Sequence, residues 1–543
     1  MKKIFSHIDS LKDAIEKIEK KWEIVIVAFT SLLVVFGVVI GIGTIDSGYH
    51  LVDDHEMLTW SYWFKYCDED LLHRISEKLK IEFSYRYRPI YIIMRILGAK
   101  YIGPNLVWHS VIKALETSFA MFMLYFCGKS MGATKIASML FSLCSLVGYQ
   151  ACTWWKLGTH EIQGVIYFAV GMFFMLAYLK NRKLRDAVVS ILSFVIMANY
   201  KESFIMLAPF IMLYVVYYEL TLDASDDVLN WKRIWVSIKN HFWYLCILGI
   251  VFLIPVFIII SRVGLNNYDN IGLEADVPLS TYISVWKESL ETDLKWCKRF
   301  GIVMIAVLLT FWTELKKAWK ELILLAVFLL PQMILYGREG LYERYLLPTM
   351  IGLAWFFVIV VSKKRILSET GMRWAVYGAA VLLLLAAHGR AALREADYFT
   401  YRGQSVTTAF KTVTEISKGK YNILSCLHPN TEANFTIRYW LAHEGYENIY
   451  YWIEEDLSVH KEGKSIQITS EHGEDEYSQE TYPFEDMDII VMYNREDRHW
   501  CYDPTLELTD FVEIPCGTLT IYVRKDSGVE IPQIHVQGLK IHF

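Results

Sequence analysis

Several common functional signatures are missing from this 543-residue sequence. It contains no Cys-x-x-Cys pair and no His-Glu-x-x-His run, so the usual zinc-ligand spacings are absent. It has no glycine-rich phosphate loop, which leaves dinucleotide binding without support. Basic residues are not in excess, because 54 lysines and arginines face 59 acidic residues and the formal net charge is −5. We therefore expect no nucleic-acid partner.

Apolar residues are abundant and lie in long blocks. They make up 54% of the chain, aromatic residues make up 15%, and the mean hydropathy is +0.27. A helix of about 17 to 25 apolar residues can cross a hydrocarbon core of roughly 30 Å with its backbone polar groups satisfied. The sequence therefore predicts a polytopic α-helical membrane protein with about 11 transmembrane helices, near 22–45, 103–126, 133–153, 161–179, 184–199, 202–218, 241–261, 297–314, 319–336, 345–361 and 372–388.

The short basic segments indicate the orientation, because loops rich in lysine and arginine stay in the cytoplasm. With the amino terminus inside, the cytoplasmic segments carry the basic clusters at 2–21, 180–185, 316–320 and 363–373. An odd number of spans then places the carboxyl-terminal tail outside. We predict a multi-pass protein of the plasma membrane with a cytoplasmic N-terminus and an extracytoplasmic C-terminal domain.

The chain divides into three predicted parts. Residues 1–21 have a helical apolar stripe among charges, which indicates a cytoplasmic amphipathic helix on the membrane surface. Residues 22–390 form the transmembrane domain, with long outer segments at 46–102 and 262–295. Residues 391–543 form an extracytoplasmic domain of a size suited to an independent core.

Periodicity in the tail predicts an α/β domain. The expected strands are short runs of β-branched and aromatic residues, and two segments have helical spacing. The strand-like runs lie at 421–427, 448–453, 465–469, 487–493 and 518–523, and the helical patterns lie at 406–416 and 433–443. In the first outer segment, apolar residues at 71, 72, 75 and 79 predict an amphipathic helix.

An acidic cluster follows the first apolar run. Asp53, Asp54 and Glu56 lie within four positions, and three carboxylates this close require a cation or a proton nearby. If the turn is helical, Asp53 and Glu56 share a face and Asp54 points elsewhere. A solvated acidic loop is the simpler alternative.

Other ionisable residues lie at the predicted outer ends of later spans. His160 and Glu161 open one span, Lys201 lies between two spans, and Arg344 lies in the loop before 345–361. Ionisable residues at such depths are costly and tend to line a polar cavity. Together with the acidic cluster, they describe a site that could bind a phosphate and activate a hydroxyl.

In their order and sidedness these residues resemble the GT-C superfamily of membrane glycosyltransferases, in particular protein O-mannosyltransferases and aminoarabinose transferases. The resemblance covers about residues 20–390. It is carried by four elements, namely Asp53-Asp54-His55, Tyr87-Arg88-Pro89-Ile90, Tyr200-Lys201-Glu202 and Glu343-Arg344-Tyr345-Leu346-Leu347-Pro348.

The resemblance implies an inverting glycosyltransferase that uses a polyprenyl-phosphate-linked sugar donor. Either Asp53 or Asp54 would be the catalytic base, with a preference for Asp53 as the first acid of the pair. The donor phosphate would be bound by Arg344 first, because a guanidinium makes paired contacts with phosphate oxygens, and then by Lys201 and Arg88. The acceptor is a lipid, a protein or a polysaccharide of the cell envelope.

The roles of the remaining candidates stay open at this point. His160 and Glu161 either orient the acceptor, hold a divalent cation together with the first-loop acids, or satisfy a helix end. Glu56 either tunes the base or contributes to such a metal site, so metal dependence is undecided. Arg88 could also anchor a helix at the lipid headgroups.

Two rival functions share some of these features. A membrane transporter would also have many spans and buried charges, but it usually shows repeated halves, and the sequence has no internal repeat. A non-catalytic GT-C-shaped subunit of envelope polysaccharide assembly would keep the fold, but it has no need of Asp53, Lys201 and Arg344.

Overall fold

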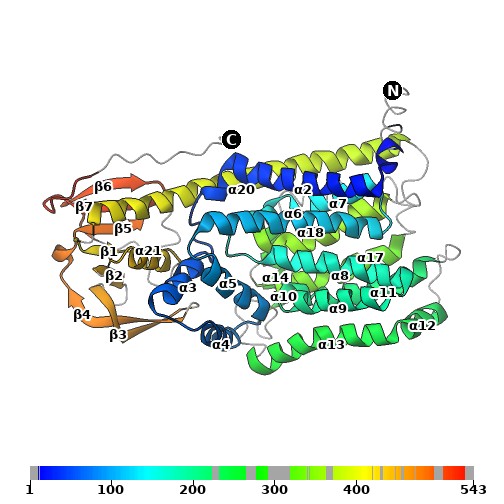
Figure 1. Ribbon diagram of the computed structural model, residues 1–543, viewed down its shortest axis with the longest axis horizontal. Helices are drawn as coiled ribbons and strands as arrows, with labels where there is room; N and C mark the ends of the chain where they lie inside the picture. Colours follow the sequence, from blue (N-terminus) through cyan, green and yellow to red (C-terminus); the bar gives the residue numbers. More distant parts are fainter. Residues whose placement is uncertain are drawn as a thin grey trace.

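The computed structural model has two parts, a helical bundle and a mixed α/β domain beyond one end of it (Figure 1). It describes residue 10 and residues 13–222, 231–263, 277–291, 318–338, 340–341, 343–362, 371–418, 420–427, 432–446, 448–453, 458–470, 473–494 and 506–531. Helix α2 (Lys20–Ile42) begins at the end of the bundle farthest from the sheet. The amino-terminal side and the tail domain thus lie at opposite ends, and the membrane side that each faces stays a prediction.

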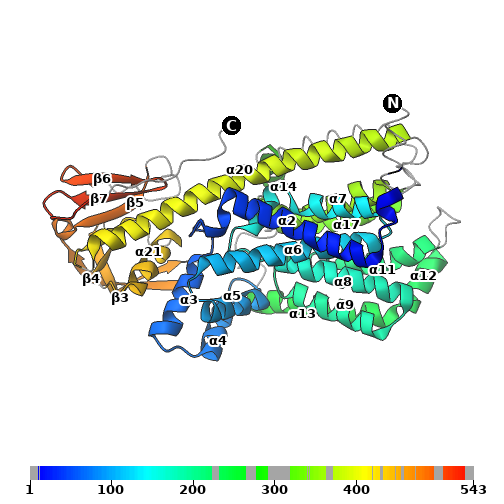
Figure 2. The same ribbon diagram turned by 45° about the horizontal axis from the view of Figure 1, so that its top comes forward.

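Most of the bundle consists of helices that lie nearly side by side, the greater part of them apolar (Figures 1 and 2). After α2 they are α6 (Leu106–Ser130), α7 (Lys135–Leu146), α8 (Glu161–Asn181), α9 (Leu184–Ala198), α10 (Glu202–Ile205), α11 (Ala208–Leu222), α12 (Trp231–Asn240), α13 (Phe242–Ile258), α14 (Leu279–Glu291), α17 (Trp319–Leu335) and α18 (Leu346–Ala354). Within the described ranges, six helical stretches are long and apolar enough to cross a membrane: Lys20–Ile42, Leu106–Ser130, Glu161–Asn181, Glu202–Thr221, Phe242–Val263 and Glu343–Val360.

Several of the other predicted spans are shorter than expected, interrupted, or outside the described residues. Helices α9 and α17 have the predicted positions, but they contain only 15 and 17 residues. The predicted span at 133–153 is interrupted, because α7 ends at Leu146 and Gly148, with φ +148°, leads into the 3-10 helix η2 (Tyr149–Trp154). The predicted span at 297–314 lies outside the described residues. The number eleven therefore stays a prediction.

The first outer segment folds into three short helices, α3 (His55–Tyr66), α4 (Leu71–Glu82) and α5 (Pro89–Tyr101). The apolar side of α4 packs against Trp60 and Tyr91, as expected for an amphipathic helix. Pro89 occupies the first turn of α5, where its missing N–H costs nothing. The segment thus folds back over one end of the bundle and carries polar loops between its helices.

Helix α20 (Gly371–Ser417) joins the two parts without a break. Its first half runs along the bundle, and its second half reaches the sheet (Figure 2). There Val406, Phe410 and Val413 are fully buried in the core of the tail domain. The predicted boundary near residue 390 therefore lies inside one continuous helix.

The tail domain contains a seven-stranded sheet with the order β4-β3-β2-β1-β5-β7-β6. Strand β1 pairs in parallel with β2 and β5, and the outer pairs are antiparallel. The elements are β1 (Ile423–Ser425), α21 (Glu432–His443), β2 (Ile449–Ile453), β3 (Ser458–Ser470), β4 (Gly473–Tyr482), β5 (Ile489–Tyr493), β6 (Phe511–Cys516) and β7 (Leu519–Arg524). The predicted strands and helices lie where expected. The two edge strands, β4 and β6, were not predicted, because β4 is rich in acidic residues and β6 contains Pro515.

Candidate active site

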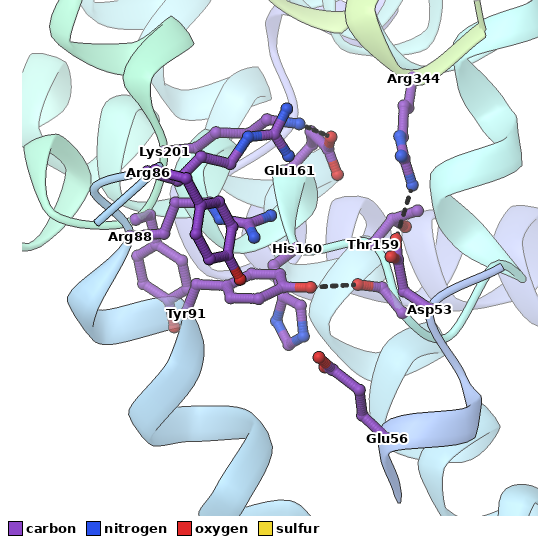
Figure 3. A pocket seen from close by; sticks show the side chains of 13 residues that line it. Asp53, Glu56, Arg86, Arg88, Tyr91, Thr159, His160, Glu161, Lys201 and Arg344 are labelled. Carbon is purple, nitrogen blue, oxygen red and sulfur yellow. Dashed lines mark hydrogen bonds and ion pairs between the residues drawn. The ribbon is translucent and has the colours of Figure 1, made fainter. Parts of the chain in front are cut away.

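One polar pocket lies between the bundle and the first outer segment and encloses about 680 Å³ of space, part of it open to solvent (Figure 3). Five separate parts of the chain contribute to it: the loop before α3, the loop before α5, the start of α8, the start of α10 and the 3-10 helix η5 (Glu343–Tyr345). The pocket is lined by Asp53, Glu56, Tyr85, Arg86, Arg88, Tyr91, Gly158, Thr159, His160, Glu161, Tyr200, Lys201 and Arg344. All the sequence-predicted site residues except Asp54 are therefore brought together, and their roles stay predictions.

Several of these side chains come from residues that cap the beginning of a helix. Arg88 precedes α5, His160 precedes α8, and Lys201 precedes α10. The first N–H groups of a helix have no partner within it, and the helix dipole makes that end positive. The beginnings of α5 and α8 therefore add positive potential to the pocket, which favours an anionic ligand.

Asp53 and Arg344 contact each other on one side of the pocket. One oxygen of the Asp53 carboxylate lies 2.9 Å from Nη1 of Arg344, and both side chains are about a quarter exposed, at 27% and 24%. Burial alone would raise the pKa of Asp53, but the charges of Arg344, Arg95 and Arg88 outweigh it and hold that pKa well below its usual range. Asp53 is therefore an ionised carboxylate that remains accessible from the pocket.

Asp54 is turned away from the pocket and is completely buried. Its carboxylate accepts a hydrogen bond from the backbone N–H of His50 at 2.5 Å. Burial, followed by the charge of Glu432, raises the pKa of Asp54 to about 6. The neighbouring aspartates thus have opposite environments, and only Asp53 is placed to meet a ligand.

Glu56 lines the pocket on the same side as Asp53. Its carboxylate lies 2.7 Å from the guanidinium of Arg95, whose side chain is fully buried behind it. Burial would raise the pKa of Glu56, but Arg95 and then Lys78 lower it overall. Glu56 is therefore an ionised group with a partner of its own, consistent with a residue that tunes its surroundings.

The opposite wall of the pocket holds three cations, and each is accompanied by a carboxylate. Lys201 lies 2.5 Å from Glu161, Arg88 lies 2.5 Å from Glu82, and Arg86 lies 3.9 Å from Glu202. Figure 3 shows Arg86, Arg88 and Lys201 on one side and the Arg344–Asp53 pair on the other, with His160 between them. Because these acids flank the cations instead of covering them, the cations can still contact a ligand.

The lining carries more positive than negative charge. Four cationic side chains and three carboxylates face the space. His160 does not add a charge, because burial, Lys113 and Arg95 lower its pKa well below the usual value. Glu82 and Glu202 offset this excess from behind the lining, but the N–H groups of the four cations and the positive helix ends still offer donors to an anion such as a phosphate.

The metal interpretation of Glu56, His160 and Glu161 gains no support from their geometry. Among the described residues, the groups of three or more ligand side chains with converging donor atoms are Glu69-His73-Glu77 and Cys152-Glu343-Glu395. Neither group contains a predicted site residue. In the second group, both glutamates already contact the buried ammonium of Lys156.

Sequence reasoning missed several residues of the pocket, among them Arg86, Tyr91 and Gly158. The signal for Arg86 was available, since two arginines alternate with tyrosines immediately before Pro89. In an extended segment, positions two apart share a side, so Arg86 and Arg88 can face one space. Arg95 could have been found as a cation in the middle of the apolar α5 helix.

No family model matches the chain, and no curated protein matches it. Among solved structures, the chain is similar to ArnT from Cupriavidus metallidurans bound to undecaprenyl phosphate. The similarity covers 95% of this chain and 100% of that chain, with a TM-score of 0.45 and 10% sequence identity. A likeness at this level carries no argument about the chemistry, which has to come from the residues of the site.

Proposed function

We propose that the protein is an inverting glycosyltransferase that moves a sugar from a polyprenyl-phosphate donor to an acceptor on the extracytoplasmic face of the membrane. The observation that supports this most strongly is the Asp53–Arg344 pair in a pocket with three further cations. An ionised, accessible carboxylate and a group of cations are the two elements that a sugar-phosphate transfer requires.

The cations would bind the donor phosphate and stabilise it as a leaving group. Arg344 is the first candidate, because its planar guanidinium has five donors and can bind phosphate oxygens while its contact with Asp53 adjusts. Arg88 and Lys201 lie on the other wall with their acidic partners (Figure 3). Cations fixed in place before the reaction stabilise the charge that develops as the phosphate leaves.

Asp53 would act as the general base. As the hydroxyl oxygen of the acceptor forms a bond to the anomeric carbon, its proton passes to the Asp53 carboxylate. The bond between the anomeric carbon and the phosphate oxygen breaks, and polyprenyl phosphate leaves with that electron pair. Attack from the side opposite the phosphate inverts the anomeric centre. Binding of the phosphate to Arg344 would weaken its hold on Asp53, so the base would become stronger when the donor is present.

A second, largely apolar cavity supports a lipid-linked donor. It lies between α5 and α6, encloses about 850 Å³ of space, part of it open to solvent, and shares His160 and Tyr200 with the polar pocket. On its rim, Met94, Tyr101 and Ile112 are exposed, as expected for side chains that face lipid. A polyprenyl chain could therefore lie along this groove while its phosphate reaches the cations.

The decisive test is sugar transfer by the purified protein in detergent, with polyprenyl-phosphate sugars as donors and product detected by mass spectrometry. We expect wild type to consume at least one donor. Asp53→Asn should lower kcat by about 10² to 10⁴, as the loss of a general base does. Arg344→Ala should lower kcat by about 10² or more.

The matched control is Asp54→Asn, which should keep most of the activity because Asp54 does not line the pocket. If wild type consumes no donor but moves a solute across proteoliposomes, the protein is a transporter and the proposal is wrong. Consumption of donor at equal rates by wild type and Asp53→Asn would remove the role of this base.

A further inference from the structure

The tail domain contacts the loop that carries Asp53 at several residues, and one of these contacts is a hydrogen bond with Asp53 itself. Helix α21 lies along α3, and its first residue, Glu432, accepts a hydrogen bond from the backbone N–H of Asp53 at 2.5 Å. The two residues are 379 positions apart in the sequence. Glu432 does not line the polar pocket, so it reaches Asp53 from behind.

The backbone of Asp53 has an unusual conformation that requires support. Its φ is +55°, and Leu51 nearby has φ +57°, in the left-handed region that non-glycine residues seldom adopt. A conformation of this kind persists only where the surroundings hold it. Glu432 satisfies the N–H that this conformation directs away from the pocket.

Two other contacts hold Asp53, and one of them would change when the donor binds. Gly158 packs directly against its backbone, and Arg344 binds its carboxylate. The proposed phosphate would compete for Arg344, so that contact weakens when the donor binds. The hydrogen bond from Glu432 lies outside the pocket and can persist through the reaction.

A second contact strengthens the link between Glu432 and the loop. The carboxylate of Glu432 lies 3.8 Å from Nδ1 of His55, the first residue of α3. The ring of His55 also stacks on Phe435, one turn further along α21, with 5.6 Å between the ring centroids. The beginning of α21 is thereby fixed against both the loop and the beginning of α3.

We propose that Glu432 is a positioning residue through which the tail domain fixes the backbone of Asp53. The carboxylate of this base is then correctly oriented only when the tail domain is docked. The inference rests on the proposed function, because it assumes that Asp53 takes a proton from the acceptor. Glu432 acts on the Asp53 backbone and touches no substrate. Through Glu432 the tail domain would contribute to catalysis, in addition to any binding of the sugar acceptor.

The other end of α21 offers a matched control. His443 lies 3.1 Å from the carbonyl oxygen of Leu58 and 3.3 Å from the hydroxyl of Ser61, both on α3. His443→Ala therefore weakens the same pair of helices but leaves Asp53 untouched. A variant that only loosens the docking of the tail domain would behave like His443→Ala.

The experiment compares Glu432→Ala, Glu432→Gln and His443→Ala in the transfer assay. Glu432→Ala removes the carboxylate that accepts the hydrogen bond from Asp53. It should lower kcat by about 10- to 100-fold and leave the KM for the sugar donor within about twofold, because a catalytic group in the wrong orientation slows the reaction without weakening binding. Glu432→Gln keeps an oxygen that can accept from Asp53 and should restore kcat to within about threefold of wild type. His443→Ala should stay within about twofold.

Unchanged kcat in Glu432→Ala would overturn the inference, and so would an equal loss of kcat in His443→Ala. If Glu432→Ala does not fold, Glu432→Met gives the same comparison, because methionine keeps the length of the side chain but has no carboxylate oxygen to accept the hydrogen bond. The two proposals fail separately. If Asp53→Asn abolishes transfer while Glu432→Ala is fully active, only this inference is wrong. If wild type transfers no sugar, the proposed function is wrong.

Discussion

Buried charges occur at both ends of the helical bundle, and the two groups are satisfied in different ways. At the end where α2 begins, the ammonium of Lys135 lies 2.6 Å from the carbonyl oxygen of Ile18 and 3.2 Å from Glu23, which also accepts a hydrogen bond from Tyr125. At the pocket end, Arg88 and Lys201 each have a carboxylate partner and line an open cavity. Lys135 opens helix α7, just as Arg88 and Lys201 precede helices, so the two groups differ in their access to the polar pocket and not in the helix dipole.

This difference separates structural charge from functional charge. Lys135 is placed where carbonyl groups already stabilise it, so it needs no ligand. The cations of the pocket each have a carboxylate partner and face an open space, so their remaining N–H groups can bind an anion. Buried charge alone does not identify a site, whereas cations that line an open cavity mark a candidate.

The largest effect that we expect from a single methyl group is that of Gly158→Ala. A Cβ at this position would lie 2.7 Å from the carbonyl carbon of Asp53, closer than real Cβ contacts, so the Asp53 backbone would have to move. We expect kcat to fall by about 10² or more, because a 1 Å displacement of a catalytic group can cost that much. The control is Gly37→Ala in α2, where a methyl meets nothing within 4 Å. Similar activities of the two variants would contradict the position given to Asp53.

A smaller loss is expected for Arg344→Lys. Lysine keeps the positive charge but offers one ammonium group in place of a planar pair of donors. We expect kcat to fall by about 10- to 100-fold, less than for Arg344→Ala in the same assay. Arg74→Lys on α4 is the matched control, since Arg74 pairs with Glu69 outside the pocket. If Arg344→Lys is as active as wild type, charge alone is sufficient and paired contacts with phosphate are not needed.

Asp54 allows a prediction of stability against pH. Its pKa is raised to about 6 by burial and by Glu432, whereas an aspartate in an unfolded chain titrates near 4. The folded protein therefore holds this proton more tightly, and the stability it contributes is present below about pH 4 and is lost as the pH rises through about 6.

Asp54→Asn cannot ionise, and its amide oxygen can still accept from His50. We expect it to be more stable than wild type above pH 6, by roughly 1 to 3 kcal/mol, with no gain at pH 4. Thermal unfolding in detergent across this range tests the expectation, with Asp46→Asn at an exposed position as the control. A gain that does not depend on pH would show that ionisation of Asp54 is not its cause.

The sequence predicted which residues form the site better than it predicted how their side chains are oriented. Asp53, Lys201 and Arg344 each stand at the edge of an apolar run on one predicted side of the membrane, so topology alone brings them to the same end of the bundle. The orientation of Asp54 could not be derived in this way. It follows from the left-handed backbone at Asp53 and from contacts with the tail domain, such as Glu432, that no local pattern reveals. Asp53 and Glu56 line the pocket and Asp54 does not, but the expected helical turn is not the reason, because Asp53 has a left-handed backbone and the helix begins at His55.

The smallest effect on activity is expected at the far end of the bundle. Lys135→Met removes a buried cation and leaves Glu23 and the carbonyl oxygen of Ile18 without it. Stability should fall by about 1 to 3 kcal/mol, because buried polar groups lose their partner. In the double variant Lys135→Met/Glu23→Gln part of this loss should be recovered, since the unpaired carboxylate is gone.

The rate of sugar transfer, measured at a temperature where all variants are folded, should stay within about twofold of wild type. A large loss of kcat would mean that charges at both ends of the bundle serve the reaction, and the separation into structural and functional charge would not hold.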